Sequence, residues 1–72
     1  MNSNMLEAEM KLNGDTGGDV AEYLGISRQT FSNKKNENGA EFTQGEIAKM
    51  AVKYSWDAEK ITAIFFTDTV SK

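Results

Sequence analysis

The chain has 72 residues, and its eleven acidic against eight basic side chains give a net charge of −3. It contains no cysteine, histidine or proline, so the residue content excludes disulfide scaffolds, thiol nucleophiles and the usual zinc sites. No stretch approaches the roughly 20 apolar residues of a membrane span, and the first residues lack the cationic and apolar regions of a signal peptide. We therefore expect a single small domain, residues 1–72, in the cytoplasm.

The first predicted helix covers about residues 4–12. Leu6 and Met10 stand four residues apart and share one helical face, while Ser3 or Asn4 can act as the N-cap. A turn-forming Asn-Gly-Asp run follows and ends the helix.

The second predicted helix covers residues 17–24. Thr16 followed by Asp19 forms a capping box with Asp in place of Glu, which sets the start. Gly25 suits the left-handed conformation in which helices often end. The apolar face of this helix consists of Val20, Ala21 and Leu24.

The third predicted helix covers residues 28–35, after Ser27 as its N-cap. We expect Phe31 to point back toward Ala21 and Leu24, so that the second and third helices pack against each other across a short turn. A loop of turn-forming composition follows at residues 36–41.

The fourth predicted helix covers residues 44–54 and is the best marked in the chain. Thr43 and Glu46 match the capping box, and the apolar stripe has helical spacing. This stripe comprises Ile47, Met50, Ala51 and Tyr54.

The fifth predicted helix covers residues 57–65 and begins at Ser55 or Asp57. The tail at 67–72 has little to bury, so we expect it to be flexible. This last third is rich in aromatic residues, and a domain this small need not bury them all. Core packing accounts for Tyr54 and one of the two final phenylalanines. The others suggest a partner surface, with the candidates Trp56, Ile64, Phe65 and Phe66.

The third helix differs from the rest of the chain in charge. Between Ser27 and Asn36 there are three cations and no acid, whereas the remaining residues have five basic against eleven acidic side chains. An acidic protein can still approach DNA if its charge is polarised, because phosphate contacts depend on the local potential. Three cations nevertheless imply weak binding by one protomer, so we expect a homodimer or a heterocomplex.

The chain resembles small phage Cro and repressor proteins of the lambda-repressor-like family. The resemblance is specific through residues 6–36 and looser through residues 42–54 to the final aromatic pair. It rests on Leu6, Ala8, Met10, Thr16, Val20, Ala21, Leu24, Gly25, Ile26, Ser27, Thr30 and Ser32. It implies an all-α, compact five-helix domain in which the second and third helices form a helix-turn-helix, acting in the cytoplasm and on the nucleoid of a bacterial host.

The resemblance also implies a set of DNA-binding residues. Arg28 would suit guanine O6 and N7, and Gln29 would suit adenine N6 and N7, as the first exposed residues of the recognition helix. Lys34 and Lys35 would hold the phosphate backbone. The full set implied is Ser27, Arg28, Gln29, Ser32, Asn33, Lys34, Lys35 and Asn36.

Two departures from the family pattern stand out. Many relatives begin the second helix with a glutamine that braces the recognition helix and contacts a phosphate, but this chain has Gly17 and Gly18. Relatives also place an apolar residue where this chain has Asp15, which suggests a looser edge or a nearby partner surface.

Two functions are compatible with these residues. The first is a Cro-like transcriptional regulator that dimerises and inserts residues 27–36 into the major groove of operator DNA. The second is an antirepressor, or modulator of repression, that acts through a protein complex with the cognate phage repressor. We expect neither an enzyme nor a metal or cofactor site, since the sequence has no nucleophile and base pair.

Overall fold

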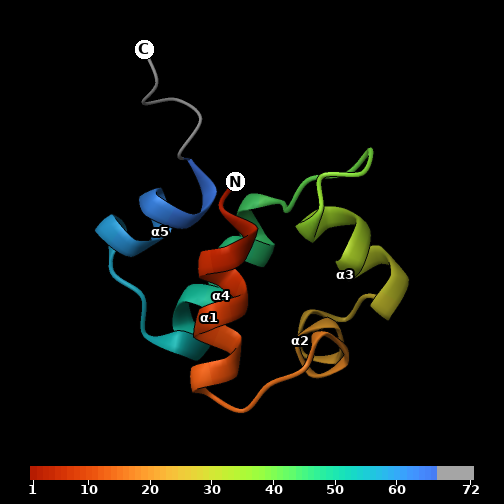
Figure 1. Cartoon of the computed structure of the whole chain (residues 1–72), viewed down its shortest axis with the longest axis horizontal. Coiled ribbons are helices and arrows are strands. Elements are labelled where there is room, and N and C mark those ends of the chain that lie inside the picture. Colours follow the sequence, from red (N-terminus) through yellow and green to blue (C-terminus); the bar gives the residue numbers. More distant parts are fainter. Residues whose placement is uncertain (67–72) are drawn as a thin grey trace.

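The computed structural model describes residues 1–66, which form five α-helices and no strand (Figure 1). The helices are α1 (Ser3–Leu12), α2 (Gly17–Leu24), α3 (Arg28–Lys35), α4 (Gln44–Tyr54) and α5 (Ala58–Phe65). The predicted all-α fold is confirmed. The tail predicted to be flexible, residues 67–72, lies outside the described residues. No helix within residues 1–66 has the length and apolar character needed to cross a membrane.

The helices form a compact bundle in which α1 runs through the middle. In Figure 1, α2 and α3 lie on one side of α1 and α5 lies on the other side. Helix α2 contacts both α3 and α4, and α1 contacts α5. The pair formed by α2 and α3 therefore stands at one edge of the molecule, where α3 has an outward face.

Local capping sets most of the helix starts. In α2, the Thr16 hydroxyl accepts from the Asp19 amide and the Asp19 carboxylate accepts from the Thr16 amide, and Thr43 and Glu46 repeat this arrangement in α4. Both predicted capping boxes are confirmed. The fifth helix starts one residue later than predicted because Asp57 is its N-cap, accepting from the Lys60 amide.

The start of α1 corrects a prediction. Its N-cap is Asn2, which accepts from the Met5 amide, rather than Ser3 or Asn4. The Asn2 amide donates to the carbonyl of Ile64 at 2.6 Å, which holds Asn2 outside the helix in extended conformation. The Ser3 hydroxyl instead donates to the Lys35 carbonyl at 2.7 Å. Contacts with distant residues thus decide where this helix begins.

The core lies where the five helices meet. Phe31 of α3 is almost completely buried, and its ring meets the Phe42 ring edge-on at 5.6 Å. Phe42 in turn meets Phe65 of α5 at 5.9 Å. The buried apolar residues are Leu6, Met10, Val20, Ala21, Leu24, Phe31, Met50, Tyr54, Trp56 and Ile64.

The core includes two residues that the sequence assigned to a partner surface. Ile64 is 0% exposed and Trp56 is 9% exposed, so neither is available at the surface. The Trp56 ring lies 5.2 Å from the Tyr54 ring and 5.9 Å from the Phe65 ring, and its Nε1 donates to Glu9 at 3.0 Å. Glu9, 47 residues away in the sequence, therefore accepts the hydrogen bond of the indole N–H, which allows the Trp56 ring to be buried.

Candidate nucleic-acid interface

The turn between α2 and α3 fixes the orientation of α3. Gly25 ends α2 in the left-handed conformation with φ of 77°, and the Ile26 amide returns to the Ala21 carbonyl at 3.0 Å. Ser27 then caps α3, accepting from the Thr30 amide at 3.0 Å, while its hydroxyl donates to the Thr30 hydroxyl at 2.8 Å. The Ser27 hydroxyl proton is thus already used within α3.

Five of the predicted contact residues lie along α3 at helical spacing. Arg28, Gln29 and Asn36 are exposed, and Ser32 and Asn33 are half-buried. Gln29 donates to Asn33 at 3.2 Å, and Asn36 donates to Ser32 at 3.4 Å, each pair four residues apart. These two pairs align uncharged hydrogen-bond donors and acceptors along α3. Such groups can bind the edges of DNA bases or polar groups of another protein.

The structure places Lys34 and Lys35 differently from the sequence prediction of phosphate anchors. Lys34 Nζ lies 2.7 and 2.8 Å from the two carboxylate oxygens of Glu46, and both side chains are only 14% exposed. Lys35 Nζ lies 2.7 Å from a carboxylate oxygen of Glu7. The two lysines therefore tie α3 to α4 and to α1, and carboxylates compensate their charges.

The contacts with the lysines lower the pKa values of both acidic partners, Glu46 and Glu7. Partial burial opposes ionisation of Glu46, but the hydrogen bonds from Lys34 and from the Thr43 amide outweigh it and lower the Glu46 pKa. The hydrogen bond and the charge of Lys35 lower the pKa of Glu7. At neutral pH both carboxylates are ionised and compensate the lysines.

Arg28 differs from the two lysines of α3, because no carboxylate of the described residues pairs with it directly, although the charge of Asp19 lies near enough to interact with it. It makes no ion pair within residues 1–66, and its guanidinium lies across the first turn of α2. A Cβ atom on Gly18 would stand 3.1 Å from Arg28 Nη2 and 3.2 Å from Nε. A Cβ on Gly17 would instead meet the Phe31 ring at an ordinary 3.6 Å. This contact could not be predicted from the sequence, since no local pattern connects residues 18 and 28.

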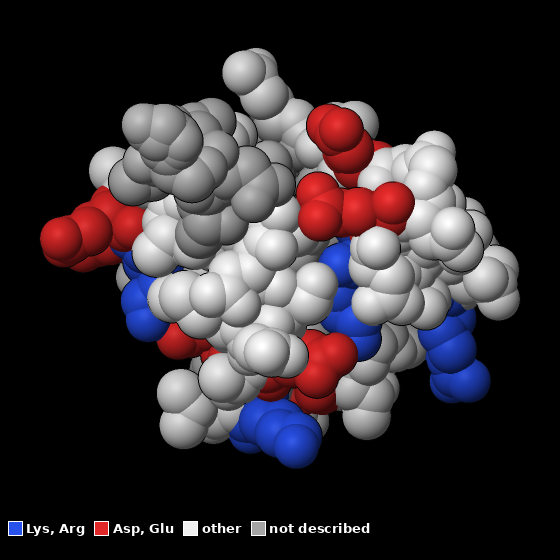
Figure 2. Space-filling model, turned by 45° about the horizontal axis from the view of Figure 1, so that its top comes forward, with Lys and Arg blue, Asp and Glu red and all other residues white. Residues whose placement is uncertain are grey.

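Charges of both signs are mixed on one face of the molecule. On the face drawn in Figure 2, acidic and basic side chains alternate and do not form separate regions.

Asp15, the second departure from the family pattern, forms contacts with α4. Its carboxylate accepts a hydrogen bond from the Tyr54 hydroxyl at 2.7 Å and lies 3.5 Å from Lys53 Nζ. Burial, together with the bond to Asp15, raises the pKa of Tyr54. Contacts within the protein therefore hold Asp15 in place.

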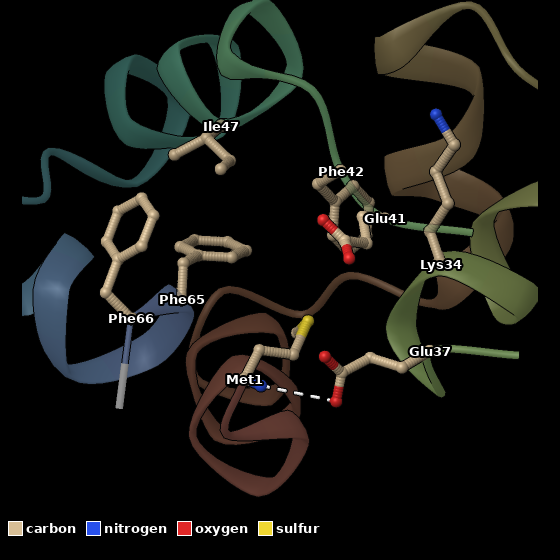
Figure 3. Close-up of a pocket in the computed structure, with 8 residues that line it drawn as sticks. All are labelled: Met1, Lys34, Glu37, Glu41, Phe42, Ile47, Phe65 and Phe66. Atoms are coloured by element: carbon tan, nitrogen blue, oxygen red, sulfur yellow. Dashed lines mark hydrogen bonds and ion pairs between the residues drawn. The ribbon is translucent and has the colours of Figure 1, made fainter. Parts of the chain in front are cut away.

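A half-open groove lies between α5, the loop before α4 and the end of α3 (Figure 3). Of the four residues that the sequence assigned to a partner surface, Phe65 and Phe66 line this groove, and Phe66 is 45% exposed. The remaining lining residues are Met1, Lys34, Glu37, Glu41, Phe42 and Ile47. Within residues 1–66 no group of three or more acidic side chains is placed to hold a metal ion.

Comparison with known proteins does not identify a family: no family model, no curated protein and no solved structure matches this chain.

Proposed function

We propose that this chain is a helix-turn-helix transcriptional regulator of the phage Cro and repressor type, which binds operator DNA through α3 in the cytoplasm of a bacterial host. The observation that carries the proposal is the outward face of α3, where Arg28 and Gln29 precede a row of uncharged polar side chains with no acid on the helix. The glycine turn at Gly25, the Ser27 cap and the buried Phe31 fix the orientation of α3 with this face outward.

Binding is proposed to require a second chain. Since Lys34 and Lys35 are paired with Glu46 and Glu7, one protomer offers few cations to phosphate. A dimer doubles the contacts and places two half-sites one DNA turn apart, roughly 34 Å. Affinity then depends on assembly as much as on Arg28.

A second candidate function is a modulator of repression that forms a complex with the cognate repressor. The same lysine pairs favour it, because they leave the α3 face almost neutral in a chain of net charge −3. A polar, nearly neutral helix face suits the surface of another protein as well as it suits DNA.

A mobility-shift assay distinguishes the two functions. The purified protein is mixed with DNA from its own promoter region, with and without the cognate repressor, at several salt concentrations. The DNA-binding function predicts a shift without repressor that weakens as salt rises. A shift or a stable complex that appears only with repressor would replace it by the modulator function.

Arg28→Ala tests the α3 face directly. We expect it to weaken DNA binding by about 1 to 3 kcal/mol and to relax base preference, because the guanidinium is the cation of α3 that forms no ion pair within residues 1–66. Competition with unrelated DNA measures the change in preference. Lys11→Ala, an exposed cation on α1, is the matched control and should change binding little.

A further inference from the structure

The first turn of α2 and the side chain of Arg28 fit together closely. Gly18 has no side chain, and the Arg28 guanidinium occupies the space beside it, with Nη2 and Nε 3.1 and 3.2 Å from where a Cβ would stand. Such distances are tighter than most Cβ contacts in proteins, so a Cβ atom at position 18 requires the guanidinium to shift by a few tenths of an ångström.

We infer that Gly18 is the positioning residue for Arg28, and that it helps to determine where the cation of α3 that has no ion pair in the described part of the chain meets its ligand. The inference rests on the proposed function, because it concerns the same surface of α2 and α3. Arginine suits this role: its planar guanidinium can lie flat on a backbone that carries no side chain, and its donors keep a fixed arrangement.

The neighbouring charges are consistent with this placement. Hydrogen bonds from the Thr16 amide and hydroxyl group lower the pKa of Asp19, and the charges of Lys53 and then Arg28 add smaller effects in the same direction. Asp19 belongs to the capping box of α2, so its carboxylate is fixed beside the turn that Arg28 covers. Gly18 thus gives space to the guanidinium, and Asp19 gives it a nearby negative charge.

Gly17 provides a matched control. It occupies the same first turn of α2, but a Cβ there meets the Phe31 ring at 3.6 Å and contacts no atom of Arg28. Alanine at either position removes one glycine from a helix and should not lower the midpoint of thermal unfolding. A change seen only in Gly18→Ala therefore reports on Arg28 rather than on α2 stability.

The test combines a spectrum of the free protein with binding to the ligand found in the mobility-shift assay, either promoter DNA or the cognate repressor. In the free protein, the NMR cross-peak of Arg28 Nε–Hε should move in Gly18→Ala and stay in place in Gly17→Ala. Gly18→Ala should weaken binding about 2- to 10-fold, less than Arg28→Ala, because the charge is displaced but not removed. Gly17→Ala should bind as the unmodified protein does.

A double-mutant cycle completes the test. In the Arg28→Ala background, Gly18→Ala should have no further effect on binding. Equal losses in both backgrounds, or an unmoved Nε–Hε cross-peak, would overturn the inference. If the unmodified protein binds neither DNA nor repressor, the proposed function fails, whereas the cross-peak comparison still decides whether Gly18 positions Arg28.

Discussion

At the residue scale, the electrostatic character of α3 depends on carboxylates that belong to other helices. Lys34 is held by Glu46 of α4, and Lys35 by Glu7 of α1. A lysine that is paired in this way contributes less to a phosphate contact, because its partner must first be displaced. Counting cations along α3 therefore overstates its positive charge, and Arg28 carries most of what remains.

Glu46→Gln should release Lys34 without removing the α4 cap, since glutamine also serves in a capping box. If α3 binds DNA, we expect higher affinity and a slope of log K against log salt that is steeper by about one phosphate contact. Mobility shifts at three or more salt concentrations measure both quantities. Unchanged affinity and slope would mean that Lys34 does not face DNA. The exposed Glu41→Gln is the control for the change in net charge.

At the element scale, local signals define the helices well. The limits of α2, α3 and α4 are those predicted, because each start depends on a side chain and an amide only three residues apart. The start of α1 uses the same kind of cap, from Asn2 to the Met5 amide, but Asn2, Ser3 and Asn4 all suit that role, and the contact that distinguishes Asn2, with the Ile64 carbonyl, is distant in the sequence. Sequence spacing thus determines an element when the deciding contact lies within one helical turn.

In the candidate site, too, local contacts are predictable from the sequence and long-range contacts are not. The outward position of Arg28 and Gln29 follows from the helical period and from the buried Phe31. The pairing of Lys34 and Lys35 does not, because their partners lie 12 and 28 residues away in the sequence. The burial of Trp56 could not be predicted either, because its hydrogen-bond partner Glu9 is distant in the sequence. Long-range pairing, rather than local pattern, determines these side chains.

The turn between α2 and α3 depends on a glycine, so we expect a substitution there to lower stability. Gly25→Ala forces a non-glycine residue to φ of 77° and should destabilise the protein by about 1 to 2 kcal/mol. Thermal or denaturant unfolding measures the loss. Gly45→Ala is the matched control: Gly45 has no positive φ, a Cβ there has room, and alanine should be neutral or stabilise by up to about 1 kcal/mol. Equal effects of the two substitutions would contradict a special role for the turn.

At the scale of the whole molecule, ion pairs and hydrogen bonds between elements make stability depend on pH. The hydrogen bond from Lys60, then that from Trp56, lowers the pKa of Glu9, and the Glu46 pKa is lowered as well. A carboxyl group with a lowered pKa in the folded state stabilises it above the pKa of the unfolded chain, and this contribution is lost as pH falls through the folded value. The protein should therefore lose stability on acidification below about pH 4.5.

Glu9→Gln tests this dependence. At pH 7 the variant should be less stable by about 1 kcal/mol, a modest value because Lys60 is partly exposed. Its free energy of unfolding should decline less steeply than that of the unmodified protein between about pH 5 and pH 3, so that the two curves converge in acid. Urea unfolding across this range measures both curves. A constant difference at all pH values would show that the charge of Glu9 does not matter.

An NMR titration can show whether the outward face of α3 binds operator DNA. Isotope-labelled protein is titrated with DNA from its own promoter region, and amide shifts are followed along the chain. If α3 binds DNA, we expect the largest shift changes at residues 28–36 and in the first turn of α2, and we expect added salt to reduce them. Changes confined to α1 or to the groove beside Phe65, or no changes at DNA concentrations that saturate binding in the mobility-shift assay, would contradict it.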